Sequence, residues 1–138
     1  MTFEDRIRDF GAASDARAAA TELLAMGEEV LESWLLAKGD TPTQDRREGF
    51  RLLALHRQGA QGDPSFNACR ESCRELVYRH NVITLREAPE DAARDLRLMS
   101  AVALHIFLFV SGKLQESQLG DFCCSSRSQQ RAMHHQEV

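Results

Sequence analysis

Apolar residues recur every three or four positions along most of this chain, which is the spacing of amphipathic α-helices rather than of strands. The first such segment runs from Thr2 to Phe10. A helix this short is marginally stable alone, so we expect its apolar face to dock on the rest of the protein. That face consists of Phe3, Ile7 and Phe10.

A longer helix is predicted from about Asp15 to Lys38, with Ser14 as its N-cap and Gly39 at its end. Its apolar stripe spans about 140°, which is wider than the seam of a two-stranded coiled coil. We therefore expect two neighbouring helices to cover it. The stripe consists of Leu23, Leu24, Gly27, Val30, Leu31, Trp34 and Leu35.

Each of the three prolines predicts the start of a further helix, because proline is favoured in the first helical turn. The third predicted helix runs from Thr41 to about Gln58, and Thr41 with Gln44 forms a capping-box pattern at its start. The fourth runs from Pro64 to about Glu87, and the last from Ala88 to about Gln118.

One face of the fourth predicted helix carries two cysteines and a histidine among ordinary core residues. Cys69, Cys73 and His80 fall within about 80° of one another, together with Leu76 and Ile83. Thiolates and imidazoles bind zinc or copper. However, His80 lies about 16 Å along the helix from Cys69, so a shared ion needs help from another helix. We favour the simpler interpretation, that all three are core residues.

The sequence leaves open two further ligand sites, which would use His80 together with other histidines or a single histidine alone. His80 could bind an ion together with His56 or His105, and His80 or His105 could ligate haem, although no haem-attachment motif is present. No Glu-x-x-His pattern supports a di-iron site. No phosphate-binding loop or nucleophile motif occurs either, which lowers the expectation of an enzyme and leaves that question open.

The last predicted helix is apolar nearly all round, which is typical of a helix that is buried on all sides. One face suits a bundle core: Leu96, Met99, Ala103, Phe107, Val110 and Leu114. The second face needs a partner, and we favour another copy of the same chain; the alternative is coverage by the first helix. This predicted oligomer interface consists of Leu98, Ala101, His105, Leu108 and Phe109.

Within that interface, two symmetry-related copies of His105 could meet across an axis. A buried protonated imidazole must be paired or solvated. The sequence therefore suggests a pH-sensitive contact between subunits.

Charge and hydropathy narrow the possible partners. The 138 residues carry a net charge of −4, which argues against nucleic-acid binding. The longest apolar run, Leu98–Val110, has 13 residues and is short for a membrane span. The N-terminus has no secretory signal pattern, so we expect a soluble, cytoplasmic protein.

Acidic residues lie among a local group of arginines, which we interpret as a solvated face: Arg46, Arg47, Arg51 and Arg57.

Together these features predict an all-α, up-and-down antiparallel four-helix bundle with a short N-terminal helix and a flexible C-terminal tail. Residues 1–120 form a single helical domain, and residues 121–138 form the polar tail. The leading functional hypothesis is a homo-oligomeric, non-enzymatic interaction or regulatory protein. The alternative is a metal-, haem- or small-molecule-binding bundle that uses the face of Cys69, Cys73 and His80. The sequence identifies no cofactor and no partner other than a second copy.

Overall fold

The computed structural model describes residues 1–85 and 91–117. Over these residues the protein contains five α-helices, one 3-10 helix and no β-strand, which confirms the predicted all-α fold. The start predicted at Ala88 and the predicted tail, residues 121–138, lie outside the described residues. The elements are α1 (Phe3–Gly11), α2 (Ala16–Ala37), α3 (Arg51–Ala60), η1 (Pro64–Cys69), α4 (Arg70–Leu85) and α5 (Ala92–Glu116).

The first two helices begin with side-chain caps. The Thr2 hydroxyl accepts a hydrogen bond from the backbone N–H of Asp5 at 3.0 Å, and the Asp5 carboxylate accepts one from that of Thr2 at 3.3 Å. In α2 the cap is Asp15 rather than the predicted Ser14, and its carboxylate accepts from the N–H of Ala18 at 3.1 Å. Each cap satisfies an N–H that has no partner inside its helix.

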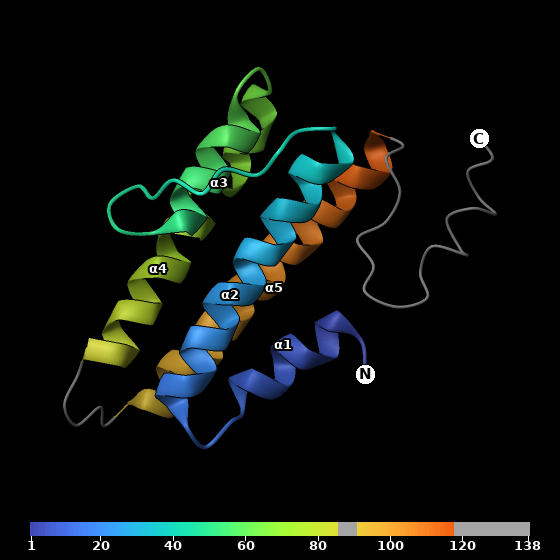
Figure 1. Ribbon diagram of the computed structural model, residues 1–138. Helices are drawn as coiled ribbons and strands as arrows, with labels where there is room; N and C mark the ends of the chain where they lie inside the picture. Colours follow the sequence, from blue (N-terminus) through green and yellow to red (C-terminus); the bar gives the residue numbers. More distant parts are fainter. Residues whose placement is uncertain (86–90, 118–138) are drawn as a thin grey trace.

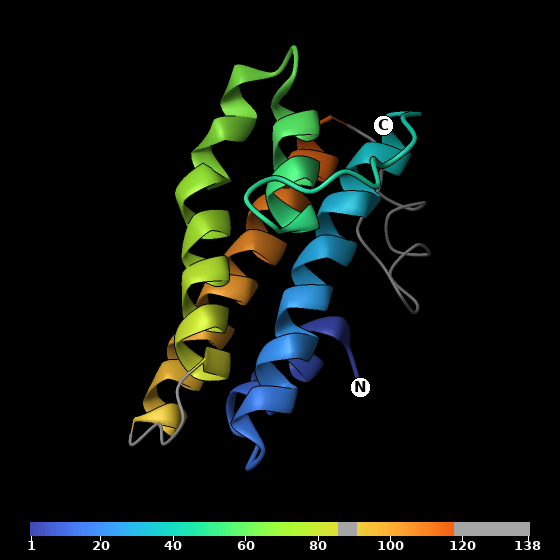
Figure 2. The same cartoon turned by 60° about the vertical axis from the view of Figure 1, so that its left-hand side comes forward.

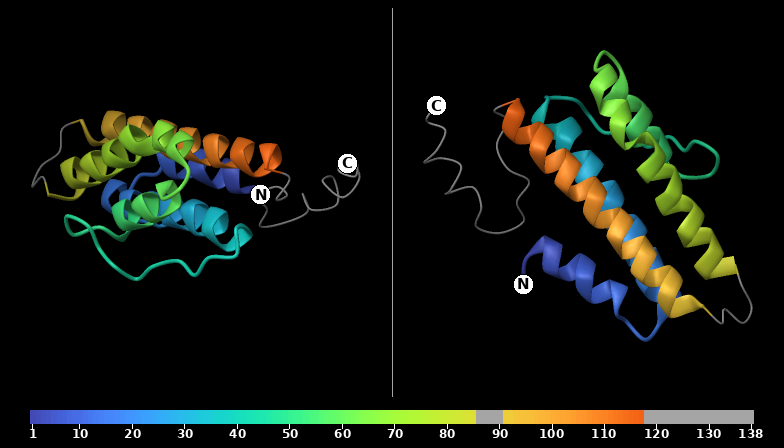
Figure 3. Two further views of the ribbon diagram at one scale, coloured as in Figure 1. Left: turned by 90° about the horizontal axis from the view of Figure 1, so that it is seen from above. Right: turned by 180° about the vertical axis from the view of Figure 1, so that it is seen from behind.

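Three long helices, α2, α4 and α5, form the body of the protein (Figure 1). α2 and α5 lie side by side, α4 packs against both of them, and α3 packs against α2 and α4. The views in Figures 2 and 3 show α1 on the other side, against α5 and, less extensively, α2. Buried apolar side chains from all of these helices form one core cluster.

The segment between α2 and α3 decides how the helices alternate. Figure 1 shows that α3, α4 and α5 alternate in direction, whereas α2 and α3 run the same way. The chain leaves the upper end of α2, returns downward as an extended segment over residues 38–50, and then enters α3. The sequence pattern predicted a helix from Thr41 onward in this part of the chain. In the structure, a non-helical segment brings the chain back from the upper end of α2 instead.

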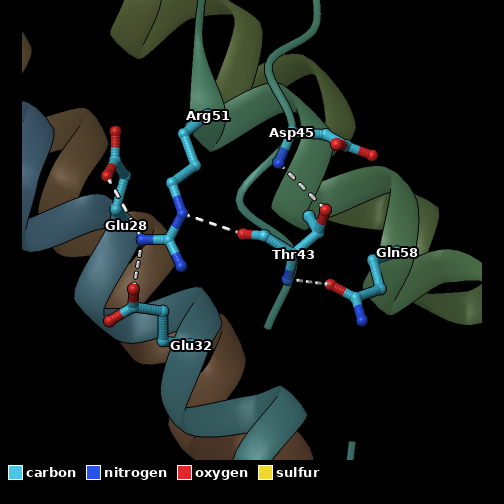
Figure 4. Close-up of polar contacts among 6 residues, drawn as sticks. All are labelled: Glu28, Glu32, Thr43, Asp45, Arg51 and Gln58. Atoms are coloured by element: carbon cyan, nitrogen blue, oxygen red, sulfur yellow. Dashed lines mark hydrogen bonds and ion pairs between the residues drawn. The ribbon is translucent and has the colours of Figure 1, made fainter. Parts of the chain in front are cut away.

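The helix predicted to begin at Thr41 begins instead at Arg51, so the predicted start is wrong. The side chain of Gln58, in α3, binds the backbone of this segment in its non-helical conformation (Figure 4). The amide oxygen of Gln58 accepts a hydrogen bond from the N–H of Thr43, and its amide nitrogen donates to the carbonyl oxygen of Thr41, both at 2.9 Å. A helix capped at Thr41 would use the Thr41 carbonyl oxygen in its own ladder, and the bond from Gln58 occupies that acceptor instead.

A tight turn at Glu48 and Gly49 also excludes a helix here. Their φ angles are 55° and 88°, in the left-handed region. On either side of the turn, the backbones of Arg47 and Phe50 exchange two hydrogen bonds of 3.0 Å. The turn leaves Arg46 and Arg47 exposed at the surface.

Arg51, the first residue of α3, ties this loop to α2 (Figure 4). Its Nε donates to the carbonyl oxygen of Thr43 at 2.9 Å, and its guanidinium pairs with Glu32 and, at 3.7 Å, with Glu28. Burial raises the pKa of Glu28, and the positive charge of Arg51 opposes that shift. One side chain therefore fixes the loop and neutralises two half-buried carboxylates.

Candidate functional site

The face that carries the two cysteines begins at a junction between two kinds of helix. Cys69 is the last residue of the 3-10 helix η1, and Cys73 lies in the first turn of α4. Both side chains are fully buried, and both thiols are free. Leu76 and Ile83, which share their face, are also fully buried. Most of this face therefore lies in the protein core.

His80 has different neighbours from the cysteines. It is half-buried, its ring meets that of Phe50 edge-on at 5.9 Å, and its Nδ1 lies 3.3 Å from the Oδ1 of Asn81. Within residues 1–85 and 91–117, no group of three His, Cys, Asp or Glu side chains is placed to hold a metal ion. The predicted trio of Cys69, Cys73 and His80 thus shares a helix face but does not form such a group.

The histidine beside the cysteines is His56 of α3. Its Nε2 lies 3.2 Å from the carbonyl oxygen of Phe66, and the thiol of Cys69 donates to the same oxygen at 3.4 Å. The ring of His56 also stacks on that of Phe66, with the centroids 5.5 Å apart. Sequence spacing gave no sign of this pairing, because His56 and Cys69 are brought together by the turn between α3 and η1.

Cys69 and Cys73 shift each other's pKa in opposite directions. A hydrogen bond from Cys73 and the neighbouring His56 lower the pKa of Cys69 to about 6, against the opposing effect of burial. The same hydrogen bond and burial raise the pKa of Cys73 well above its usual value. Of the two thiols, Cys69 is therefore the one that loses its proton first, and its hydrogen bond to the carbonyl oxygen of Phe66 exists only while it is protonated. Because neither sulfur is exposed, this chemistry is internal to the core.

The predicted oligomer interface lies on α5. Four residues along one line of this helix are exposed, and we call them the α5 strip: Ala101, His105, Leu108 and Gly112. Leu108 is 52% exposed. Leu98 and Phe109, also in the predicted interface, are half-buried beside the strip, and Phe109 packs on Phe66 with the rings 5.8 Å apart.

The N-terminal helix covers a different side of α5. The rings of Phe3 and Phe107 stack at 5.3 Å, and Ser100 donates a hydrogen bond to the carbonyl oxygen of Ile7. Phe107 and Ser100 are buried. α1 therefore completes the core on that side and leaves the α5 strip uncovered among the described residues.

Charges stand only at the ends of the strip. No charged residue occurs from position 98 to 112, whereas Arg94, Arg97 and Glu116 are exposed just beyond it. Lys113 is half-buried and turned away: its Nζ pairs with Asp63 at 3.2 Å and lies 5.4 Å from the centre of the Trp34 ring. The strip is thus an uncharged surface with a positive and a negative end.

By length and composition alone, α5 would also be long enough and apolar enough to cross a membrane. In its most apolar 18-residue window, 39% of the residues are buried inside the protein. The core helix of a soluble protein satisfies the same criterion, so this property does not decide what covers the strip.

Nothing matches this chain among the protein-family models, the curated proteins and the solved structures compared with it.

Proposed function

We propose that this protein is a soluble, cytoplasmic, non-enzymatic interaction protein that associates with a second copy of itself through the α5 strip. The main observation that supports this proposal concerns residues 98–112, a stretch of fifteen residues without a charge. Within it, four residues are exposed: Ala101, His105, Leu108 and Gly112. An exposed apolar helix face is a typical site of protein association. Its free, buried thiols also suit a reducing compartment.

The charges at the two ends favour a second copy in antiparallel orientation. If a two-fold axis passes near His105, residues equally distant from it along the helix lie opposite each other. Arg94 and Glu116 are equally distant from His105, so each arginine would face the partner's glutamate. Neither has an ion pair with another described residue. Ala101 and Gly112, the two small residues of the strip, would let the two helices approach closely.

The expected association is weak. One helix face buries less than the roughly 800 Å² per partner of a standard interface. A dimer that forms at micromolar or higher concentration, rather than an obligate one, is consistent with this area and with a monomer that has its own core.

His105 makes the proposed contact sensitive to pH. At the axis it would face the same residue of the second copy, and the neighbouring residues Ala101, Leu104 and Leu108 supply no counter-charge. Imidazoles gain their charge between about pH 8 and 5, and two facing cations repel each other. We therefore expect the dimer to weaken as the pH falls through this range.

As the scaffold of this surface we propose a four-helix bundle of α2, α3, α4 and α5. The contacts of α5 with α2 and α4, and of α3 with α2 and α4, support this arrangement. In this bundle α5 has one core face, one side covered by α1 and one free side.

Disulfide cross-linking at the axis tests the proposal. His105→Cys, in a background with Cys123→Ser and Cys124→Ser, should form a covalent dimer under mild oxidation. The matched control is Leu36→Cys, because Leu36 is 62% exposed on α2, away from the strip. Adding Leu108→Glu should abolish the cross-link by placing a charge in the apolar contact.

A lack of dimer with His105→Cys, or equal cross-linking with Leu36→Cys, would contradict the proposal. Binding of the unmodified chain to phosphatidylcholine vesicles, with no dimer in solution, would assign the strip to lipid instead.

A further inference from the structure

A second surface feature is a small pocket whose polar lining is almost entirely basic. It has a volume of about 150 Å³ and lies where the 41–50 loop, α3, η1 and α4 meet. The residues that line it include no aspartate or glutamate. Its polar lining consists of Arg47, His56, Arg57, Asn67, Arg70 and Arg74.

Four guanidinium groups around one hollow are unexpected in a chain with a net charge of −4. Two of them already have partners: Arg74 pairs with Glu48 at 2.8 Å and Arg70 with Glu71 at 3.0 Å. Arg47 and Arg57 have no ion pair with any carboxylate in the described parts of the chain. The pocket therefore keeps an excess of positive charge.

The pocket is held in shape by contacts outside it. Arg47 stands on the loop that Arg51 and Gln58 tie down, so its backbone is positioned before any ligand arrives. The wall contributed by His56 is fixed as well, since this buried side chain contacts the carbonyl oxygen of Phe66. Groups that are ordered beforehand lose less entropy on binding.

A larger hollow of about 450 Å³ adjoins the pocket and shares Arg47 and Arg57 with it. Its further lining is mixed and polar, with Thr43, Asp45, Arg46 and Gln58 among its residues. If a ligand placed one doubly charged group between Arg47 and Arg57, the adjoining hollow would have room for an uncharged polar portion of the same ligand.

We infer that the pocket lined by Arg47, Arg57, Arg70 and Arg74 binds the phosphate group of a small phosphomonoester, whose organic part occupies the adjoining hollow. Guanidinium groups bind phosphate oxygens in pairs and with good geometry, more strongly than they bind neutral acceptors. The volume of the pocket suits a single tetrahedral anion. This binding does not depend on the proposed self-association, because the pocket lies away from α5.

Calorimetric titration at about 0.15 M salt tests the inference, because screening at this ionic strength suppresses nonspecific attraction. Inorganic phosphate and glycerol 3-phosphate should each bind saturably to one site. Arg47→Gln and Arg57→Gln should each weaken both ligands about tenfold, or about 1.4 kcal/mol. Both residues are exposed, so these variants should fold. The matched control is Arg97→Gln, at an exposed arginine on α5.

Arg46 separates the two parts of the site, because it lines only the adjoining hollow. Arg46→Gln should weaken glycerol 3-phosphate and leave inorganic phosphate unchanged. Equal affinity for the two ligands, unaffected by Arg46→Gln, would overturn the ester assignment in favour of the free ion. An absence of saturable binding, or an equal loss with Arg97→Gln, would overturn the site itself.

Discussion

The hydroxyl of Ser100 donates a hydrogen bond to the backbone carbonyl oxygen of Ile7, 2.9 Å away, across 93 positions of sequence. This bond joins the middle of α5 to α1 and helps to determine which side of α5 is covered. Gly11 lies against the same serine: a Cβ built at Gly11 would come within 2.6 Å of both the Cβ and the Oγ of Ser100. The absence of a side chain at Gly11 therefore permits the close approach of the two helices.

Gly11→Ala should destabilise the protein by about 1–3 kcal/mol, because the added methyl group forces α1 away from Ser100. The matched control is Gly112→Ala, since a Cβ at Gly112 has no neighbour within 4 Å. That substitution should be neutral or stabilising by up to about 1 kcal/mol, because alanine favours helix. Urea unfolding of dilute protein measures both effects. Equal effects of the two substitutions would mean that the contact between Gly11 and Ser100 is not tight.

Replacing Arg51 tests the anchor of the 41–50 loop. Arg51→Met should lower the free energy of unfolding by about 1–3 kcal/mol, since it leaves half-buried carboxylates without a counter-charge. It should also speed tryptic cleavage after Arg46 or Arg47, because the loop loses its bond from Arg51 to Thr43. Arg8→Met is the control: Arg8 pairs with Glu4 on the exposed surface of α1, and its loss should cost under about 1 kcal/mol.

The pH dependence of the Arg51→Met variant has a definite sign. The pKa of Glu28 is raised in the folded protein, and removal of Arg51 raises it further. A raised carboxyl pKa contributes stability below its unfolded value, and this contribution is lost as the pH rises through the folded value. The deficit of Arg51→Met relative to the parent should therefore be smaller at acidic pH, below the ordinary value of 4.5, than at neutral pH. A deficit that does not change with pH would contradict this role of Glu28.

The thiol pair can be titrated by the ultraviolet absorbance of its thiolate. With Cys123→Ser and Cys124→Ser in place, one thiolate should appear near pH 6, and Cys69→Ala should remove that transition. Cys73→Ala should raise the pKa of Cys69, because it removes the donor that stabilises the thiolate. Since the pKa of Cys69 is lowered on folding, its contribution to stability is present at pH 9 and lost as the pH falls through 6. Ionisation of both thiols only near 9.0 would contradict the arrangement.

Local signals predicted most of the helices. The apolar spacing in α1, α2 and α5 is a short-range feature, and the structure contains these helices. The capping pattern at Thr41 was equally good locally, but Gln58 and Arg51 bind the backbone of that segment from α3. Sequence spacing alone does not reveal a competing partner that is 15 positions away.

The same limit applies to the candidate sites. A helical projection correctly placed Cys69 and Cys73 on a buried face, but it could not identify His56 as their neighbour. Of the arginines near position 50 that were interpreted as a solvated face, Arg46, Arg47 and Arg57 are exposed. The sequence did not indicate that Arg70 and Arg74 of α4 line the same pocket as Arg47 and Arg57. Both groupings arise from the turn between α3 and η1.

Charge reversal tests the direction of the proposed α5 pairing. Arg94→Glu and Glu116→Arg should each weaken the dimer, because each places like charges opposite one another. The double variant should regain most of the lost affinity, since the pair is restored with its signs exchanged. Additive weakening in the double variant, measured by sedimentation, would exclude the antiparallel arrangement about His105.

The most direct test of the central claim is the mass of the unmodified chain in solution as a function of concentration. Sedimentation equilibrium at about pH 8, where imidazole is neutral, should give 15.5 kDa in dilute solution and approach twice that value above about 100 µM. Leu108→Glu should remain at 15.5 kDa throughout, and Leu36→Glu should behave like the parent. A mass of 15.5 kDa for the unmodified chain at every concentration would contradict self-association through the α5 strip.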